Sequence, residues 1–146
     1  MVRLGRIGMG MVLVPMLSNP EVRNVTVLES NLHVIRLVEQ AVRAYVGCIL
    51  ECKLTVIQAD AYVWNPWPGV KWDCIYFDIW PDICTDNLEG IAKLKRRYAK
   101  RLNRDNPKAW MDAWVEGRLR AQRRRERASE GYARAFGFKC GGMRGL

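Results

Sequence analysis

Histidine is almost absent from this 146-residue sequence, which contains only His33. The five cysteines are odd in number and irregularly spaced, and only Cys48 and Cys52 lie close together. A structural zinc site needs several Cys or His ligands in paired spacings. We therefore expect no metal site and interpret the cysteines as buried thiols. This cysteine usage suits a reducing compartment, so we expect a cytoplasmic protein.

Long hydrophobic runs are also missing. The longest run near the amino terminus, 9–17, is interrupted by Gly10 and Pro15. It falls well short of the ~20 residues that span a bilayer, so we expect no transmembrane helix and no membrane partner. Two arginines precede the run as in a signal peptide, but 18–20 is a poor cleavage site. The segment is predicted to be the first helix of a domain.

The excess of positive over negative charge is confined to one part of the chain. The composition, 49% hydrophobic and 27% charged, is ordinary for one globular domain. Residues 1–89 carry 7 Lys and Arg against 10 Asp and Glu, whereas residues 90–146 carry 17 against 5. The formal net charge of +9 therefore comes entirely from the second segment. We predict a core over 1–90 and a basic helical extension over 91–146, packed on the core or trailing from it.

Short apolar runs rich in β-branched residues, each followed by an acidic residue, predict strands. They are 25–28 before Glu29, 54–57 before Asp60, and 74–77 before Asp78. Apolar residues that do not alternate with polar ones are typical of strands covered on both faces of a parallel sheet. Between the first two runs, apolar residues recur at helical spacing after the capping candidate Asn31, which predicts a crossover helix.

The flanking segments extend this βαβ pattern. Residues 2–4 are predicted to be a strand stub that leads into a glycine-rich turn and a helix over 11–17. The prolines of 65–69 predict a loop. We predict an α/β fold, a Rossmann-like three-layer sandwich with a short, mostly parallel sheet of about four strands.

The basic part of the chain is predicted to be helical. Residues 105–107 are expected to end a first helix and begin a second, which runs from about Lys108 through the arginines of 118–127. The end, 137–146, is expected to fray. One apolar stripe characterises the first helix, formed by Ile91, Leu94, Tyr98 and Leu102.

The glycine-rich turn and the first acidic strand end suggest an adenosine-type ligand. Gly8 and Gly10 allow a ligand to approach the backbone closely. Glu29 follows Gly10 by 19 positions, near the ~20-residue spacing at which a carboxylate accepts hydrogen bonds from ribose hydroxyls. The glycines do not form G-x-G-x-x-G, which argues against a nicotinamide cofactor. Alternatively, the glycines only form a tight turn and Glu29 is a solvated strand end.

The other two acidic strand ends suggest contacts to a base and to a substrate. Asp60, followed by Ala61, could accept a hydrogen bond from an adenine amine, or could be a turn or capping residue. Asp78 lies at the carboxyl edge of the predicted sheet, and with Asp82 and Trp80 it could hold and deprotonate a cationic amine. Alternatively, Asp82 and its neighbour Asp86 cap the next helix and Trp80 is part of the core.

Together these positions resemble the class I S-adenosylmethionine-dependent methyltransferase fold, and within it most closely the spermidine synthase-like group. The resemblance covers roughly residues 5–90. It implies that Glu29 binds ribose, Asp60 lies near adenine, and Asp78 lies near the reacting amine as the catalytic residue. The implied cofactor is S-adenosylmethionine or its decarboxylated form. The matching motifs are Gly8 with Gly10, 25–29, Asp60 with Ala61, and 73–78.

The sequence departs from this family mainly in its first motif. Arg6 stands where the first glycine of G-x-G-x-G belongs, and Leu4 where an acidic residue belongs. The N-P-P-Y signature and the amino-terminal β domain of polyamine synthases are missing. We therefore expect a truncated member with a degenerate first motif, whose sheet could be completed by a partner chain in a homo-oligomer.

Two functional hypotheses follow. The first is an S-adenosylmethionine-binding transferase that moves a methyl or aminopropyl group to a small amine, or that is inactive through truncation. The second is a non-catalytic accessory protein that binds nucleic acid or an acidic partner through the arginines of 118–127. These arginines could also be only a solvated helix face.

Overall fold

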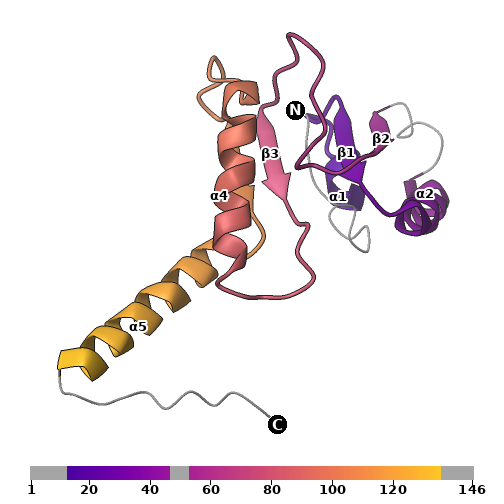
Figure 1. Ribbon diagram of the computed structural model, residues 1–146. Coiled ribbons are helices and arrows are strands. Elements are labelled where there is room, and N and C mark those ends of the chain that lie inside the picture. The colour runs from indigo at the N-terminus through magenta and orange to yellow at the C-terminus, as the bar shows by residue number, and fades with distance from the viewer. Residues whose placement is uncertain (1–12, 47–52, 136–146) are drawn as a thin grey trace.

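The computed structural model describes residues 13–46 and 53–135, which form short parallel strands and helices (Figure 1). The first part contains α1 (Leu13–Ser18), β1 (Val25–Glu29), α2 (Leu32–Val46) and β2 (Leu54–Gln58). The second part contains β3 (Cys74–Phe77), α4 (Asn87–Tyr98), a 3-10 turn (Ala99–Arg101), β4 (Trp110–Ala113) and α5 (Glu116–Ala135).

The first part is the predicted βαβ unit. β1 pairs in parallel with β2, with Val25 opposite Leu54 and Glu29 opposite Gln58. Asn31 caps the crossover helix α2, since its Oδ1 accepts a hydrogen bond from the His33 amide at 2.9 Å. All five residues of β1 are buried, which explains why Val25, Val27 and Leu28 are apolar and why the polar residue among them, Thr26, is β-branched. The predicted strands over 25–28 and 54–57 and the helix between them are confirmed.

The second part is built around α4, which lies against β3 (Figure 1). The strand predicted over 74–77 is confirmed as β3. Ile91, Leu94 and Tyr98 on α4 are completely buried, as the predicted apolar stripe requires. Residues on both sides of the predicted boundary at residue 90 share this core. Its fully buried side chains include Trp72, Ile75, Phe77, Ile91, Leu94, Tyr98 and Leu119.

The four described strands do not form the single sheet that we predict. They form two parallel pairs, β1 with β2 and β3 with β4, and no ladder joins the pairs within residues 13–46 and 53–135. The pairs still share a core, because Leu28 of β1 belongs to the same cluster as Ile75 and Phe77 of β3. The strand predicted over 2–4 lies outside the described residues, as does the glycine-rich turn that follows it.

The helix predicted from Lys108 is wrong at its start. The chain instead forms β4, which pairs in parallel with β3 from Trp110 opposite Cys74 to Ala113 opposite Phe77. Backbone hydrogen bonds to β3 replace the bonds of a helix in this segment. Val115 then adopts a positive φ of 51°, so the helical conformation of α5 begins only after it.

Leu102 also departs from its predicted place on a helix. The chain leaves the helical conformation at Leu102, which has an extended backbone and forms a parallel bridge with Trp72. The Trp72 amide donates to the Arg101 carbonyl, and the Asn103 amide donates to the Trp72 carbonyl, both at 2.8 Å. Backbone pairing to the segment before β3 therefore ends the helical region earlier than the apolar stripe suggests.

Two arginines of the basic region hold the loop before β3. Arg97 donates to the Val63 and Trp64 carbonyls at 2.8 and 3.0 Å. Arg101 donates to the Pro66 and Trp67 carbonyls at 3.2 and 3.1 Å. The loop predicted over 65–69 is confirmed, and these bonds supply donors for carbonyl groups of the loop backbone.

The Asp73 carboxylate is hydrogen-bonded to the turn before β4, and this makes the stability of the fold depend on pH. Its Oδ1 accepts hydrogen bonds from the side-chain amides of Asn103 at 2.8 Å and Asn106 at 2.9 Å. The bond from Asn106 and then that from Asn103 hold the pKa of Asp73 below its usual value. This stabilisation is present above the ordinary aspartate pKa and is lost as the pH falls through the lowered one.

We therefore expect Asn106→Ala to lower the melting temperature at neutral pH and to lower it less in acid, where the wild-type carboxylate is also protonated. Thermal unfolding followed by circular dichroism between pH 2 and 7 measures this difference. Asn87→Ala is the control, because the Asn87 side chain donates to the backbone carbonyl of Asp82. A gap between Asn106→Ala and wild type that stays constant with pH would contradict the assigned role of Asp73.

Candidate functional site

A cavity of about 280 Å³ lies at the carboxyl ends of β1 and β2. Open α/β sheets bind their ligands at this edge. The structure therefore brings together Glu29, Asp60 and Ala61, three of the residues that the sequence analysis selects for cofactor binding. The cavity is lined by Leu28, Glu29, Ser30, Ala59, Asp60, Ala61, Tyr62 and Ile79.

Glu29 is a buried carboxylate in the wall of this cavity. The residue is 1% exposed, so its alternative interpretation as a solvated strand end is wrong. Its Oε1 accepts a hydrogen bond from the Asn31 amide at 2.8 Å and one from the Ser30 hydroxyl at 3.5 Å. These bonds hold the Glu29 carboxylate in the cavity wall, and a carboxylate accepts hydrogen bonds from hydroxyl groups.

Asp60 forms the turn that follows β2. Its Oδ1 accepts a hydrogen bond from the Tyr62 amide at 2.8 Å, so the turn interpretation of Asp60 describes one of its oxygens. The residue is exposed toward the cavity mouth. Its second carboxylate oxygen has no hydrogen bond to the residues that the structure describes. Asp60 can therefore form the turn and still accept a hydrogen bond from a ligand.

Tyr98 of α4 is hydrogen-bonded to this turn. Its hydroxyl donates to the Ala61 carbonyl at 2.9 Å, and both residues are buried. Burial raises the pKa of Tyr98 to about 12, against a smaller opposite effect of Arg97. The hydroxyl therefore keeps its proton and remains a donor, and one buried hydrogen bond couples the position of Ala61 to helix α4.

Tyr62 is a cavity residue that the sequence analysis missed. Burial raises the pKa of Tyr62, a hydrogen bond with Trp80 opposes the shift, and the Asp60 charge adds to it. Both aromatic side chains lie over Gly90, where a Cβ would be 2.5 Å from the Tyr62 hydroxyl and 3.2 Å from the Trp80 indole nitrogen. Glycine at this position lets α4 approach the cavity wall. The adjacency of Tyr62 to the Asp60 and Ala61 pair is the signal that could have found it.

The residues after β3 are only partly gathered at the cavity. Asp78 and Trp80 are partly buried and flank Ile79, which lines the cavity. Trp80 packs against the larger core, as its alternative interpretation holds. Asp82 is exposed and is not among the cavity residues. Asp86 occupies the cap position of α4 but makes no side-chain capping bond.

The chemistry of the cavity suits a nucleoside without phosphates. Two carboxylates face it, and none of the described residues that line it is Lys or Arg. Carboxylates accept hydrogen bonds from hydroxyl and amino groups and repel phosphates. The apolar side chains beside them can cover a base. The volume of about 280 Å³ lies just below the ~300–1,000 Å³ range of ligand sites, which suits a small ligand such as a nucleoside.

The structure describes neither glycine of the proposed first turn, since Gly8 and Gly10 lie outside residues 13–46 and 53–135. Cys48 and Cys52 also lie outside this range. Cys74 is buried and Cys84 is exposed. In the described part of the chain, no group of His, Cys, Asp and Glu could hold a metal ion. No described helix is long and apolar enough to cross a membrane.

Comparison with known proteins relates the chain to solved structures. No protein-family model and no curated protein sequence matches it. The glycopeptide N-methyltransferase MtfA matches with a TM-score of 0.53 and 16% identity over 75% of this chain and 44% of that one. The CcbJ methyltransferase from Streptomyces caelestis matches with a TM-score of 0.53 and 14% identity, over 75% and 40%. The fold is that of the class I methyltransferases.

The chain is shorter than these methyltransferases. It spans less than half the length of the MtfA and CcbJ chains. MtfA has also been solved as a complex with S-adenosylmethionine, and that structure matches with a TM-score of 0.51 and 16% identity over 70% of this chain and 42% of that one. At these identities the similarity shows the fold alone, and the evidence on the ligand lies in the residues of the cavity.

Proposed function

We propose that this chain binds S-adenosylmethionine in the cavity at the ends of β1 and β2 and acts in transfer of a group from that cofactor. The buried Glu29 carboxylate in the cavity wall carries the proposal. Burying a charged group is unfavourable unless hydrogen bonds compensate for the lost water, and buried ionisable groups in clefts are typical of functional sites. The methyltransferase fold and the S-adenosylmethionine complex of MtfA support it.

In this proposal each cavity residue holds one part of the cofactor. Glu29 accepts hydrogen bonds from the ribose hydroxyls, and Asp60 accepts one from the adenine amine. Leu28, Ala61 and Ile79 cover the base. In the same proposal, Gly8 and Gly10 bind the part of the cofactor that lies beyond the ribose and the adenine. S-adenosylmethionine supplies a methyl group already activated by its sulfonium charge.

The reaction and its substrate are the finer part of the proposal. Asp78 follows β3 beside the cavity residue Ile79, and it would accept a proton from an amine that attacks the methyl group. Trp80 and Asp82 would bind that amine. Aminopropyl transfer from decarboxylated S-adenosylmethionine, as in the spermidine synthase-like group, is the second candidate reaction. We place this activity in the cytoplasm, because the odd number and irregular spacing of the cysteines suit a reducing compartment.

Titration calorimetry with the whole chain tests the proposal. We expect S-adenosylmethionine and S-adenosylhomocysteine to bind, and ATP to bind far more weakly because its phosphates meet Glu29 and Asp60. Binding of decarboxylated S-adenosylmethionine in preference to both would favour aminopropyl transfer. If none of these nucleosides binds, or if ATP binds as well as they do, the proposed cofactor is wrong.

A further inference from the structure

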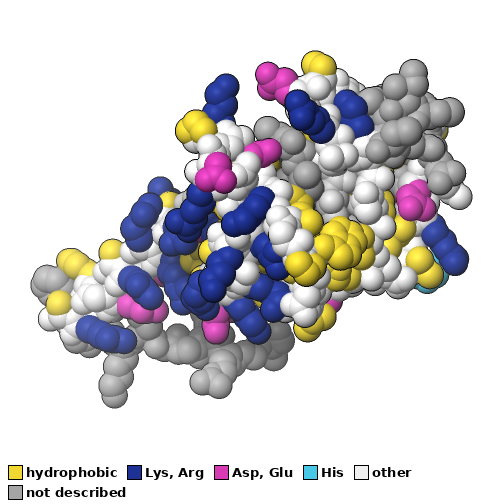
Figure 2. All heavy atoms as spheres, turned by 90° about the horizontal axis from the view of Figure 1, so that it is seen from above, with side chains coloured by type: hydrophobic (Ala, Val, Ile, Leu, Met, Phe, Trp, Pro, Cys, Tyr) yellow, Lys and Arg dark blue, Asp and Glu magenta, His cyan; other side chains and the backbone are white. Residues whose placement is uncertain are grey.

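A second hollow lies between α4 and α5, and arginines dominate it. Its volume is about 490 Å³. Figure 2 shows that Lys and Arg side chains gather over the side of the molecule that α4 and α5 form. We call the hollow the arginine groove. It is lined by Leu88, Glu89 and Ala92 of α4 and by Arg120, Arg123, Arg124 and Arg127 of α5.

Helical periodicity aligns these arginines along one face of α5. Arg123, Arg124 and Arg127 follow Arg120 by three, four and seven positions, which places all four on the same face. Arg134 follows Arg127 by another seven positions and continues the row. At about 1.5 Å per residue, the row from Arg120 to Arg134 is about 20 Å long. A small anion does not need a row of this length, whereas a linear polyanion does.

Most of the positive charge in the groove is not used by the fold. Glu116 is 5% exposed, and it pairs with Arg120 and with Lys95 of α4, which joins the two helices. Arg123, Arg124 and Arg127 make no ion pair or hydrogen bond with the residues that the structure describes. Arg97 of α4, in contrast, holds backbone carbonyls of the loop before β3. The sequence alone does not separate these two kinds of arginine.

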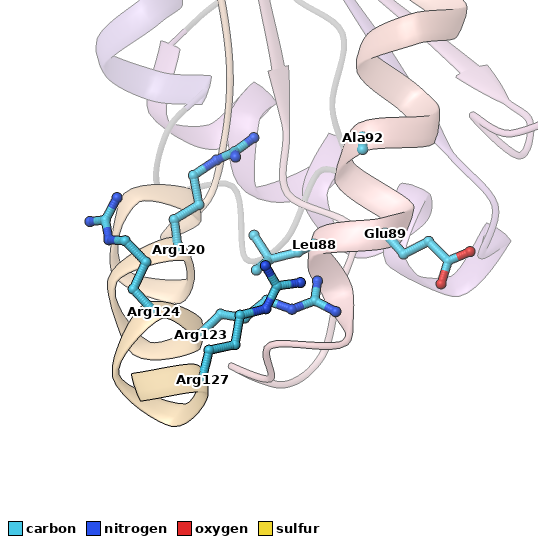
Figure 3. Close-up of a pocket in the computed structure, with 7 residues that line it drawn as sticks. All are labelled: Leu88, Glu89, Ala92, Arg120, Arg123, Arg124 and Arg127. Carbon is cyan, nitrogen blue, oxygen red and sulfur yellow. The ribbon is translucent and has the colours of Figure 1, made fainter. Parts of the chain in front are cut away.

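Two of the arginine side chains in the groove are directed toward α4. Figure 3 shows Arg123 and Arg127 reaching from α5 toward Leu88 in the first turn of α4. The Glu89 carboxylate points away from them. The acidic residue Glu126 of α5 accepts a hydrogen bond from the Gln122 side chain at 3.0 Å. The groove therefore presents the guanidinium groups of Arg123 and Arg127 beside α4, and neighbouring guanidinium groups attract phosphate.

We propose that the arginine groove binds the sugar–phosphate backbone of a nucleic acid. The phosphates of one strand follow one another at about 3.4 Å along the axis of a duplex, so the first ~10 Å of the row matches the axial rise of about three phosphates. Insertion into a membrane is disfavoured, because the large apolar side chains of α5 are Leu119, which is buried, and a single exposed Tyr132. None of the described residues that line the groove is aromatic and could stack on a base, so binding follows charge and not base sequence.

Fluorescence anisotropy with labelled 20-nucleotide RNA and DNA of mixed sequence, and without S-adenosylmethionine, tests this proposal independently of the cofactor site. Neutralisation of three phosphates on a single strand predicts an affinity loss of about 20-fold between about 50 and 200 mM salt. The double variant Arg123→Gln/Arg127→Gln is expected to lower the affinity about 10-fold at low salt. Glutamine is a good helix former, so α5 should remain intact.

The matched control is Arg118→Gln/Arg125→Gln, which removes two charges from the opposite face of the same helix. We expect this control to bind nearly as well as wild type. Equal losses in both double variants would show that only the net charge matters and would overturn the groove. If poly-glutamate binds as tightly as the nucleic acid, the ligand is better described as an acidic polypeptide. If vesicles that contain phosphatidylserine bind more tightly, the ligand is a membrane. Either result would overturn the proposal.

Discussion

Glu29→Ala is expected to lower the affinity for S-adenosylmethionine about 100-fold, because hydrogen bonds to a charged group contribute about 1.5–3 kcal/mol each and the carboxylate would make them to the ribose. Titration calorimetry measures this loss directly. The effect should be large for S-adenosylhomocysteine too, since both nucleosides contain the same ribose. Affinity unchanged by the substitution would contradict the placement of the ribose at Glu29.

Two further variants separate this role from a structural one. Glu29→Gln keeps the size of the side chain and an oxygen that can accept the Asn31 amide, so it should fold like wild type and still bind about 10-fold more weakly. Glu21→Ala removes the same charge from an exposed position outside the cavity. It should leave the affinity unchanged. Loss of binding in Glu21→Ala would point to a general effect of charge.

Trp72→Ala is expected to destabilise the protein by about 3–5 kcal/mol, the usual cost of removing a large buried aromatic side chain. Trp72 is 1% exposed and packs against Tyr98, with ring centroids 6.2 Å apart. Urea unfolding followed by far-ultraviolet circular dichroism measures the change in the free energy of unfolding. The loss is a large fraction of the ~5–15 kcal/mol that holds a typical domain together.

Trp67→Ala is the matched control for this substitution. It removes the same atoms from a side chain that is 51% exposed and contacts Trp64 edge to face. We expect it to cost less than about 1.5 kcal/mol. Equal losses in the two variants would contradict the position of Trp72 at the centre of the core.

The sequence predicts best those elements whose environment is uniform. β1 is buried along its whole length, so most of its residues are apolar and its end is marked by Glu29. The cavity residues are found because Glu29 ends β1 and because Asp60 and Ala61 follow shortly after β2. Tyr62 is missed, because its place in the wall depends on Gly90, a residue of α4 that is distant in the sequence.

β4 is missed for a related reason. Its four residues alternate between exposed and buried positions only weakly, and Trp110 is 42% exposed. Nothing local favours a strand there over a helix. The strand exists because its backbone pairs with β3, beginning with the Trp110 amide and the Asp73 carbonyl at 2.9 Å. Such a partner is not visible in the local pattern of a sequence.

The tryptophan pair at the centre of the core has an optical consequence. The rings of Trp64 and Trp72 lie 6.2 Å apart at an angle of 34°, close enough for their electronic transitions to couple and to give a signed pair of circular dichroism bands. Helix bands do not contain this signal, so its loss at constant helix content would identify a state with secondary structure but without fixed side-chain packing. The protein therefore carries an intrinsic spectroscopic label for its tertiary structure.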